Sequence, residues 1–204
     1  MTPKKDSAKI LRRSAKILQI AIYFPLKATL WLSGTRYHVT NFELQSGKSY
    51  IIAANHNSEL DPFVLTSALP FRQFLKLLPF RYIASNRHLG IWYYRMVMLP
   101  FGSFPAREHP TMSHGIEASN SILQQGQTLV IFPEGKMNGG TRLPAKRGIE
   151  ALSRDEKRLI LPVYLEKTGR KYRVITGQPF SGLDMKAEDI QDKVYALNTG
   201  TMKS

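Results

Sequence analysis

Short runs of almost wholly apolar residues, each ending at a polar or glycine-containing loop, constrain the fold of this chain most strongly. They cover residues 49–54, 128–132 and 159–165. Runs this short that lack a polar–apolar alternation are typical of strands buried on both faces, as in the interior of a sheet covered by helices. The sequence therefore predicts a central sheet with a layer of other elements on each side.

The segments between these runs carry helix signals. Helices are expected at residues 61–69, 91–99 and 111–125. The first has Asp61 as its predicted N-cap and Pro62 at N1, and the last is stopped by Gly126. A further short strand is expected at residues 82–84. Strands that alternate with helices predict an α/β fold, here a single αβ domain with a mixed central sheet flanked by helices.

The first 36 residues differ in character from the rest of the chain. Basic side chains crowd residues 1–16, and an apolar run follows at residues 17–32. This run is shorter than the ~20 mostly apolar residues that span a bilayer, and Pro25 is expected to break it into two short membrane-associating helices. We predict that residues 1–36 form a basic, apolar membrane anchor and residues 37–204 the folded domain. A helix packed on the domain's own core is the alternative.

Charge and residue usage limit the possible chemistry. The formal net charge of +14 indicates an anionic partner, which could be nucleic acid, an anionic bilayer or a phosphorylated substrate. The chain has no cysteine, which excludes disulfides, thiolate metal sites and a cysteine nucleophile. It also lacks a G-x-S-x-G elbow and a G-x-x-x-x-G-K-[ST] loop. The energy for a transfer reaction must therefore arrive with an activated donor.

His56 and Asp61 stand across the junction between a polar loop and a helix. If the loop turns back, the carboxylate can accept from one ring nitrogen and fix the tautomer, while the other nitrogen takes a proton from a substrate hydroxyl. An isolated pair of this kind is more often a turn histidine and a helix cap. Its neighbours in the sequence must decide between the two interpretations.

Two further segments supply such neighbours. Residues 132–135, Phe-Pro-Glu-Gly, end a buried strand at a turn, where glycine allows close approach of the backbone to a ligand and Glu134 offers an acceptor. Cationic side chains stand nearby in the sequence, at Arg107, Lys136, Arg142, Lys146 and Arg147. They can converge on an anionic headgroup. An ordinary turn beside a solvated basic face is the alternative.

In order and spacing these residues resemble the 1-acylglycerol-3-phosphate acyltransferases (lysophosphatidate acyltransferases) of the glycerolipid acyltransferase superfamily. Asn55-His56 with Asp61 is similar to the family's N-H-x-x-x-x-D block, and residues 132–135 match F-P-E-G. Residues 102–107 are similar to its G-x-x-x-x-R block, and residues 161–163 to its closing apolar-proline block.

The resemblance implies an αβ domain on the bilayer surface that moves a fatty acyl group from a thioester to the free hydroxyl of 1-acylglycerol 3-phosphate, giving phosphatidate. It implies His56 as general base, Asp61 as its orienting partner, and acceptor binding by Arg107 and the Glu134 loop. Together with the charges nearby, this predicts an acceptor or phosphate site formed by Arg107, Glu134, Gly135, Lys136, Arg142 and Lys146. The donor would be acyl-CoA or acyl carrier protein, with no metal or other cofactor. The protein would lie on an anionic bilayer, peripherally or as a monotopic protein on the cytoplasmic face, and no nucleic acid is expected.

One departure from the family pattern bears on the substrate. The F-P-E-G block usually continues with Thr-Arg, whereas Lys136 and Met137 follow here, so the arginine expected to hold phosphate is missing. The same chemistry on another lysolipid or on glycerol 3-phosphate is therefore an alternative. A non-catalytic basic protein that binds membrane or nucleic acid by charge alone is an alternative of another class.

Overall fold

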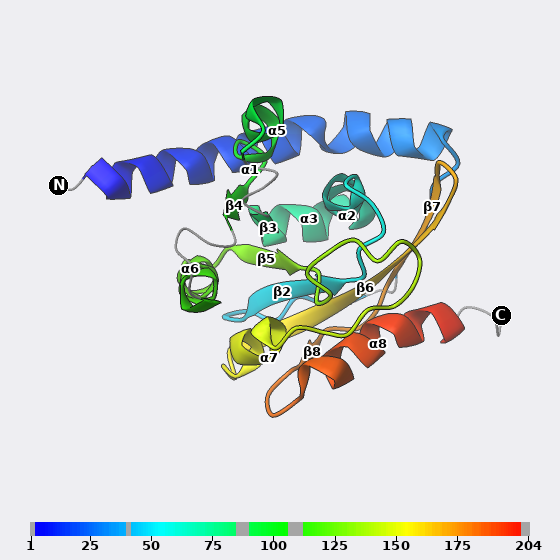
Figure 1. Cartoon of the computed structure of the whole chain (residues 1–204). Coiled ribbons are helices and arrows are strands. Elements are labelled where there is room, and N and C mark those ends of the chain that lie inside the picture. The colour runs from blue at the N-terminus through cyan, green and yellow to red at the C-terminus, as the bar shows by residue number, and fades with distance from the viewer. Residues whose placement is uncertain (1–2, 40–41, 85–89, 106–111, 201–204) are drawn as a thin grey trace.

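Helices lie on both sides of a central sheet in the computed structural model, which describes residues 3–39, 42–84, 90–105 and 112–200 (Figure 1). The described helices are α1 (Pro3–Leu32), α2 (Asp61–Ala68), α3 (Phe71–Leu77), α5 (Trp92–Met98), α6 (Met112–Gln124), α7 (Gly148–Ser153) and α8 (Ala187–Gly200). The described strands are β1 (Arg36–Val39), β2 (Ser49–Ala54), β3 (Phe80–Ala84), β4 (Ser103–Pro105), β5 (Thr128–Ile131), β6 (Arg158–Thr168), β7 (Lys171–Thr176) and β8 (Phe180–Ser181).

The strands form one eight-stranded sheet in the order β1-β7-β6-β2-β5-β3-β4, with β8 paired to β6. β6 runs antiparallel to β7 and to β8, and the other pairings are parallel. The sheet is therefore mixed, which confirms the predicted α/β fold class. The strands expected at residues 49–54, 82–84, 128–132 and 159–165 correspond to β2, β3, β5 and β6.

β2 illustrates why the apolar runs become interior strands. Ile52 faces the layer of α1, α2 and α3, and belongs to one buried core with Tyr23 and Val64. Ile51 points to the opposite face and belongs to a second core with Ile190 of α8. Successive side chains of a strand point to opposite faces, so a strand with helices on both sides needs apolar residues at every position.

α1 is one continuous helix, and the expected break at Pro25 is wrong. Proline costs an interior helix about 3 kcal/mol, but α1 is held by side-chain contacts to the domain ahead of the proline. Gln19 Nε2 donates to the carbonyl oxygens of Phe80 and Phe101, Gln19 Oε1 accepts from the Phe80 N–H at 3.0 Å, and Tyr23 Oη donates to Leu69 O at 2.7 Å. These contacts keep the helix on the sheet through Pro25.

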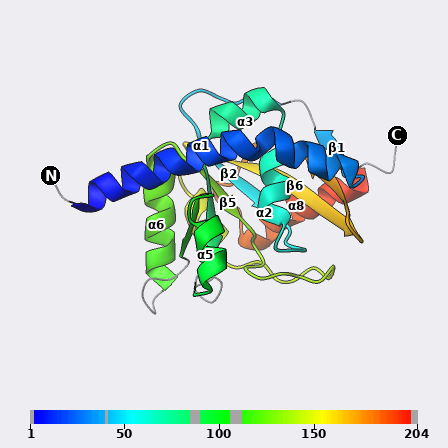
Figure 2. The same cartoon turned by 90° about the horizontal axis from the view of Figure 1, so that it is seen from above.

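The exposed side of α1 carries large apolar side chains. Ile17 is 68% exposed, Phe24 59% and Trp31 63%. Figure 2, viewed from above, shows α1 running across the molecule with α3 on one side and α5 on the other. Of the helices that the structure describes, none is long and apolar enough to cross a bilayer.

Candidate active site

The histidine loop and the Phe-Pro-Glu-Gly turn meet at one edge of the sheet. β2 and β5 are parallel neighbours, with Ala53 opposite Ile131, so the segments that follow them emerge side by side. Figure 1 shows the loop after β5 beside the start of α2. The carboxyl ends of parallel strands are the usual place for sites in open α/β sheets. The fold thus brings together residues 55–61 and residues 132–147.

His56 and Asp61 are in direct contact. His56 Nδ1 lies 2.8 Å from Asp61 Oδ2, with the carboxylate side chain fully buried and the imidazole 19% exposed. An ionised carboxylate only accepts hydrogen bonds, so Nδ1 carries the proton and Nε2 presents its lone pair. The ring also stacks on Phe132, with centroids 4.1 Å apart and an angle of 16° between the planes. Two contacts therefore fix the orientation of the imidazole.

Asp61 does not cap α2 as expected; it is the first residue of the helix, Leu60 precedes it as the N-cap, and Pro62 follows it. Its Oδ2 instead turns back to the loop and accepts from the backbone N–H groups of Asn57 and Ser58, at 2.6 and 2.8 Å. Buried N–H groups need acceptors, and the carboxylate satisfies these two. Asp61 Oδ1 is buried and has no hydrogen-bond partner within the described ranges.

Two asparagines fasten the histidine loop to the sheet. Asn55 Nδ2 donates to Leu165 O and its Oδ1 accepts from Leu165 N–H, both at 2.7 Å. Asn57 Nδ2 donates to the same carbonyl. The Asn55 side chain thus continues the ladder of hydrogen bonds between β2 and β6, and His56 follows directly from a fixed point.

Glu134 is buried, and α8 holds its carboxylate. Tyr195 Oη donates to Glu134 Oε1, and Gln191 Nε2 donates to the same oxygen at 3.4 Å. Glu134 Oε2 is buried and has no partner among the described residues. Asn138 of the same loop donates its backbone N–H to His56 O at 2.7 Å. The Glu134 turn therefore lies directly beside the histidine loop.

The predicted cationic residues occupy different places. The Lys146 side chain crosses Gly135, where an added Cβ would lie 2.6 Å from Nζ, and Gly135 also has a φ of +67° that favours glycine. Lys136 is exposed in the same turn. The Arg142 guanidinium is bound to α8, where it donates to Gln191 Oε1 at 3.2 Å and pairs with Asp192.

The fourth predicted cation, Arg107, lies outside the described residues. Gly102, the first residue of the segment similar to the family's G-x-x-x-x-R block, lies just before the amino end of β4. Because β4 is parallel to β3, this end faces the edge of the sheet opposite to His56.

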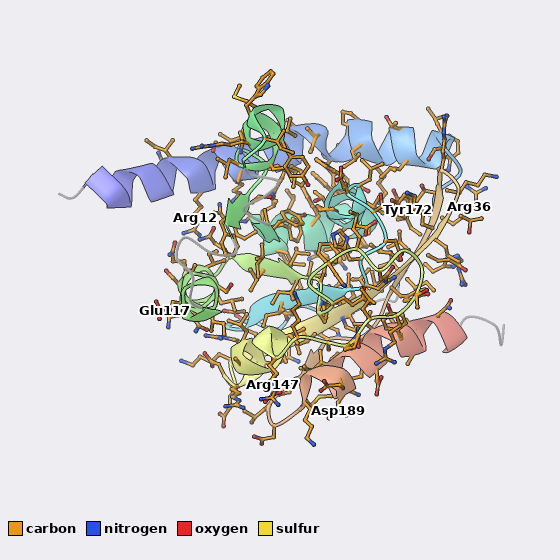
Figure 3. All side chains as sticks on the ribbon, viewed as in Figure 1. Arg12, Arg36, Glu117, Arg147, Tyr172 and Asp189 are labelled. Carbon is orange, nitrogen blue, oxygen red and sulfur yellow. The ribbon has the colours of Figure 1, made fainter. Side chains whose placement is uncertain are left out.

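Burial affects two tyrosines at the site. Burial raises the pKa of Tyr172 on β7 to about 12, and the negative charge of Asp61 acts in the same direction. Figure 3 shows Tyr172 next to α2. Burial also raises the pKa of Tyr195, and its hydrogen bond to Glu134 adds to this effect. Both hydroxyl groups therefore remain protonated at neutral pH.

Sequence reasoning missed four polar residues that shape this site, namely Asn57, Asn138, Gln191 and Tyr195. The last two come from α8, which no sequence pattern had connected with the site. Within the described ranges, no group of three or more His, Asp or Glu side chains could hold a metal ion.

Comparisons with known proteins agree with this geometry. A family model described as Acyltransferase matches residues 36–166. The probable 1-acyl-sn-glycerol-3-phosphate acyltransferase of Mycoplasma pneumoniae is 29% identical over 115 residues, which are 56% of this chain and 42% of that protein. The 1-acyl-sn-glycerol-3-phosphate acyltransferase of Borreliella burgdorferi is 30% identical over 149 residues, 70% of this chain and 56% of that protein.

A solved structure shares the fold. The crystal structure of the 1-acyl-sn-glycerophosphate (LPA) acyltransferase PlsC from Thermotoga maritima matches with a TM-score of 0.61 and 16% identity, covering 100% of this chain and 83% of that one. The chain spans about half the length of the two curated relatives. Because one continuous family match takes in the histidine loop, the Phe-Pro-Glu-Gly turn and most of β6, over more than half of the chain, this protein belongs to the acyltransferase family.

Proposed function

We propose that this protein is an O-acyltransferase that moves a fatty acyl group from a thioester to the free hydroxyl of 1-acylglycerol 3-phosphate, giving phosphatidate. The observation that carries the proposal is the 2.8 Å contact between His56 Nδ1 and Asp61 Oδ2 beside the Glu134 turn. A histidine held in this tautomer is a general base. The names of the two curated relatives support the choice of lysophosphatidate as acceptor.

In the proposed reaction the acceptor hydroxyl attacks the thioester directly. His56 Nε2 takes the hydroxyl proton as the oxygen forms its bond to the acyl carbon. The carbon–sulfur bond then breaks, and the leaving thiolate takes the proton from the imidazolium. Asp61 stabilises the imidazolium through Nδ1 and remains ionised. This scheme requires no covalent acyl-enzyme, and acyl-CoA or acyl carrier protein serves as the thioester donor.

Acceptor binding is assigned to the turn after β5. Glu134 Oε2 is buried without a partner among the described residues and can accept from a hydroxyl of the acceptor. Lys146 lies across Gly135 and Lys136 is exposed beside it, so both can reach a phosphate as point charges. Arg107 remains part of the proposed phosphate site. Arg142 has protein partners of its own, so we assign it the smallest share of phosphate binding.

We further propose that the protein works on the cytoplasmic surface of an anionic bilayer, contacted by exposed side chains of α1 and α5. Trp92 is 75% exposed, Met96 69% and Val97 53%, and they add to the exposed apolar side chains of α1. Exposed Arg12, Arg13 and Lys16 lie on the same helix α1. Apolar side chains next to basic ones favour binding to a surface of anionic lipid.

The test is transfer of a radiolabelled acyl group from acyl-CoA, and separately from acyl carrier protein, to a panel of lysolipids and glycerol 3-phosphate, with mass analysis of the products. We expect phosphatidate from 1-acylglycerol 3-phosphate. His56→Ala should lower turnover by roughly 10² to 10⁴, whereas His38→Ala, at an exposed histidine of β1, should not change it. Turnover of His56→Ala near that of the wild type would contradict the mechanism.

The same chemistry on another lysolipid is the second candidate. Lys136 and Met137 stand where the family usually has Thr-Arg, and Arg142 is committed to α8. Lysine neutralises phosphate without the bidentate geometry of arginine, so a wider range of anionic headgroups can be accepted. If another lysolipid gives the main product, the protein is still an acyltransferase, but its acceptor is not lysophosphatidate.

A further inference from the structure

We propose that Tyr195 of the C-terminal helix α8 is a positioning residue that ties the Glu134 turn to the histidine loop. The inference rests on the proposed function, because the two loops are assigned there to acceptor binding and to proton transfer. It adds α8, which lies beyond the family match over residues 36–166, to the parts of the chain that determine the rate.

The Tyr195 hydroxyl joins two side chains of the loop after β5. It donates to Glu134 Oε1 and accepts from Asn138 Nδ2 at 3.2 Å. Glu134 is 1% exposed and Asn138 8%, so the loss of the Tyr195 hydroxyl would remove a hydrogen-bond partner from two buried side chains. A hydroxyl is suited to this position because it both donates and accepts.

Asn138 carries the link on to His56. Its backbone N–H donates to His56 O at 2.7 Å, and its Oδ1 accepts from the N–H of Gly140 at 2.9 Å. Asn138 is therefore fixed by its side chain to α8 and by its backbone to the histidine loop. A shift of Asn138 would therefore move His56 relative to Glu134.

The ring of Tyr195 is held independently of its hydroxyl. It packs edge-on against Tyr164 of β6, with centroids 5.6 Å apart, and the Arg142 guanidinium lies 4.9 Å from its centroid. Phenylalanine preserves these ring contacts. Tyr195→Phe therefore removes the link between the loops while leaving the packing of α8 on the sheet in place.

The neighbouring tyrosine provides a matched control. Tyr164 is half-buried against Tyr195, and its hydroxyl makes no hydrogen bond to the described residues. Tyr164→Phe removes a hydroxyl from the same aromatic pair without touching Glu134 or Asn138. A purely structural role for tyrosine hydroxyls on this side of the sheet would show equally in both variants.

The experiment compares steady-state kinetics of wild type, Tyr195→Phe, Tyr164→Phe, Asn138→Ala and the Tyr195→Phe/Asn138→Ala double variant, with thermal unfolding of each. Misplacement of reacting groups by about 1 Å can cost 10²-fold in rate. We expect kcat of Tyr195→Phe to fall roughly 10- to 100-fold, with a much smaller change in acceptor KM. Tyr164→Phe should keep wild-type kinetics, and the double variant should be little slower than Asn138→Ala alone, because both changes break one link.

A readout without catalysis separates this inference from the proposed function. Amide hydrogen exchange of residues 134–140 should speed up in Tyr195→Phe and stay unchanged in Tyr164→Phe. A wild type that acylates no member of the lysolipid panel would refute the proposed function, whatever the exchange shows. Wild-type kinetics in Tyr195→Phe, additive losses in the double variant, or equal exchange in both tyrosine variants would overturn the positioning role.

Discussion

At the scale of single residues, the site depends on one carboxylate oxygen. Asp61 Oδ2 accepts from His56 Nδ1 and from the backbone N–H groups of Asn57 and Ser58. The same atom therefore fixes the histidine tautomer and the shape of the loop. Hydrogen bonds to an ionised group each contribute about 1.5–3 kcal/mol, so the site and local stability depend on a common interaction.

Asp61→Asn should consequently lose both activity and stability. The amide oxygen can take the place of Oδ2, but it carries no charge, so its hydrogen bonds are weaker and it stabilises the imidazolium less. The N–H₂ group would lie at the buried position of Oδ1, which has no hydrogen-bond partner among the described residues. We expect turnover to fall by about 10² or more and the free energy of unfolding to fall by roughly 1–3 kcal/mol. Kinetics and urea unfolding measure the two effects.

Asp189→Asn, at an exposed position in the first turn of α8 (Figure 3), is the matched control and should change neither quantity appreciably. An Asp61→Asn variant with a full free energy of unfolding and reduced turnover would mean that the two loop N–H groups do not depend on the carboxylate charge.

At the scale of elements, α1 belongs to the folded domain through Gln19. The side-chain amide of this buried residue bonds the N–H and C=O of Phe80, where β3 begins, and the C=O of Phe101, just before β4. One polar side chain therefore supplies hydrogen-bond partners to backbone groups at the start of β3 and in the turn before β4. The helix contributes to the sheet edge as well as to the exposed apolar surface.

Gln19→Leu tests this role. Leucine is apolar, so it would leave three buried backbone groups without partners, at a cost of about 1–3 kcal/mol for each one that stays dry. We expect the free energy of unfolding to fall by at least about 2 kcal/mol in urea titrations. Gln124→Leu, the same change at an exposed position of α6, should have little effect. Similar stability in the two variants would contradict the anchoring of α1 by Gln19.

Elements with strong local signals could be predicted, and those defined by distant contacts could not. The apolar runs gave β2, β5 and β6, and Gly126, with a φ of +67°, ends α6 as expected. α8 was not predicted, although its buried Ala187, Ile190 and Val194 have the spacing of an amphipathic helix; its position against the sheet depends on contacts with distant residues. The expected break at Pro25 failed because Gln19 and Tyr23 act across long sequence separations.

The candidate site shows the same division. His56, Asp61 and Glu134 could be singled out because their spacing matches a family pattern, and the structure brings them together. Tyr195 and Gln191 could not be singled out, because no local sequence pattern in α8 indicates a contact with Glu134. Arg142 looked like a phosphate ligand by charge alone, and only the three-dimensional structure reveals its partners on α8.

At the scale of the whole molecule, exposed large apolar side chains are unevenly distributed. Those of α1 and α5 lie on one side of the sheet, whereas α7 and α8 cover the other (Figures 1 and 2). Exposed apolar side chains that lie near basic ones favour contact with a membrane surface. These exposed side chains support the proposal that α5 contacts the membrane together with α1.

Trp92→Ser should weaken binding to vesicles of phosphatidylglycerol. Burying a large apolar side chain contributes about 1.5–3 kcal/mol, which corresponds to a loss of affinity of roughly tenfold or more. Co-sedimentation with vesicles measures the effect, and salt should weaken binding of the wild type as the basic residues are screened. Leu183→Ser, in the turn between β8 and α8 on the other side of the sheet, is the control. Equal binding by the wild type and both variants would contradict a role of α5 in membrane binding.

The row of residues Tyr37, Val174 and Leu165 lies side by side across β1, β7 and β6, and Asn55 bonds the last of them. A short turn joins α1 to β1. Hydrogen-bonded strands therefore connect the proposed membrane helix with Asn55, the residue before His56. In the proposed bilayer-bound orientation, this connection would set the height of the imidazole above the lipid headgroups. If the proposed acceptor is a lysolipid, it would have to rise from the leaflet to that height, and we expect turnover to depend on the packing density of the lipids.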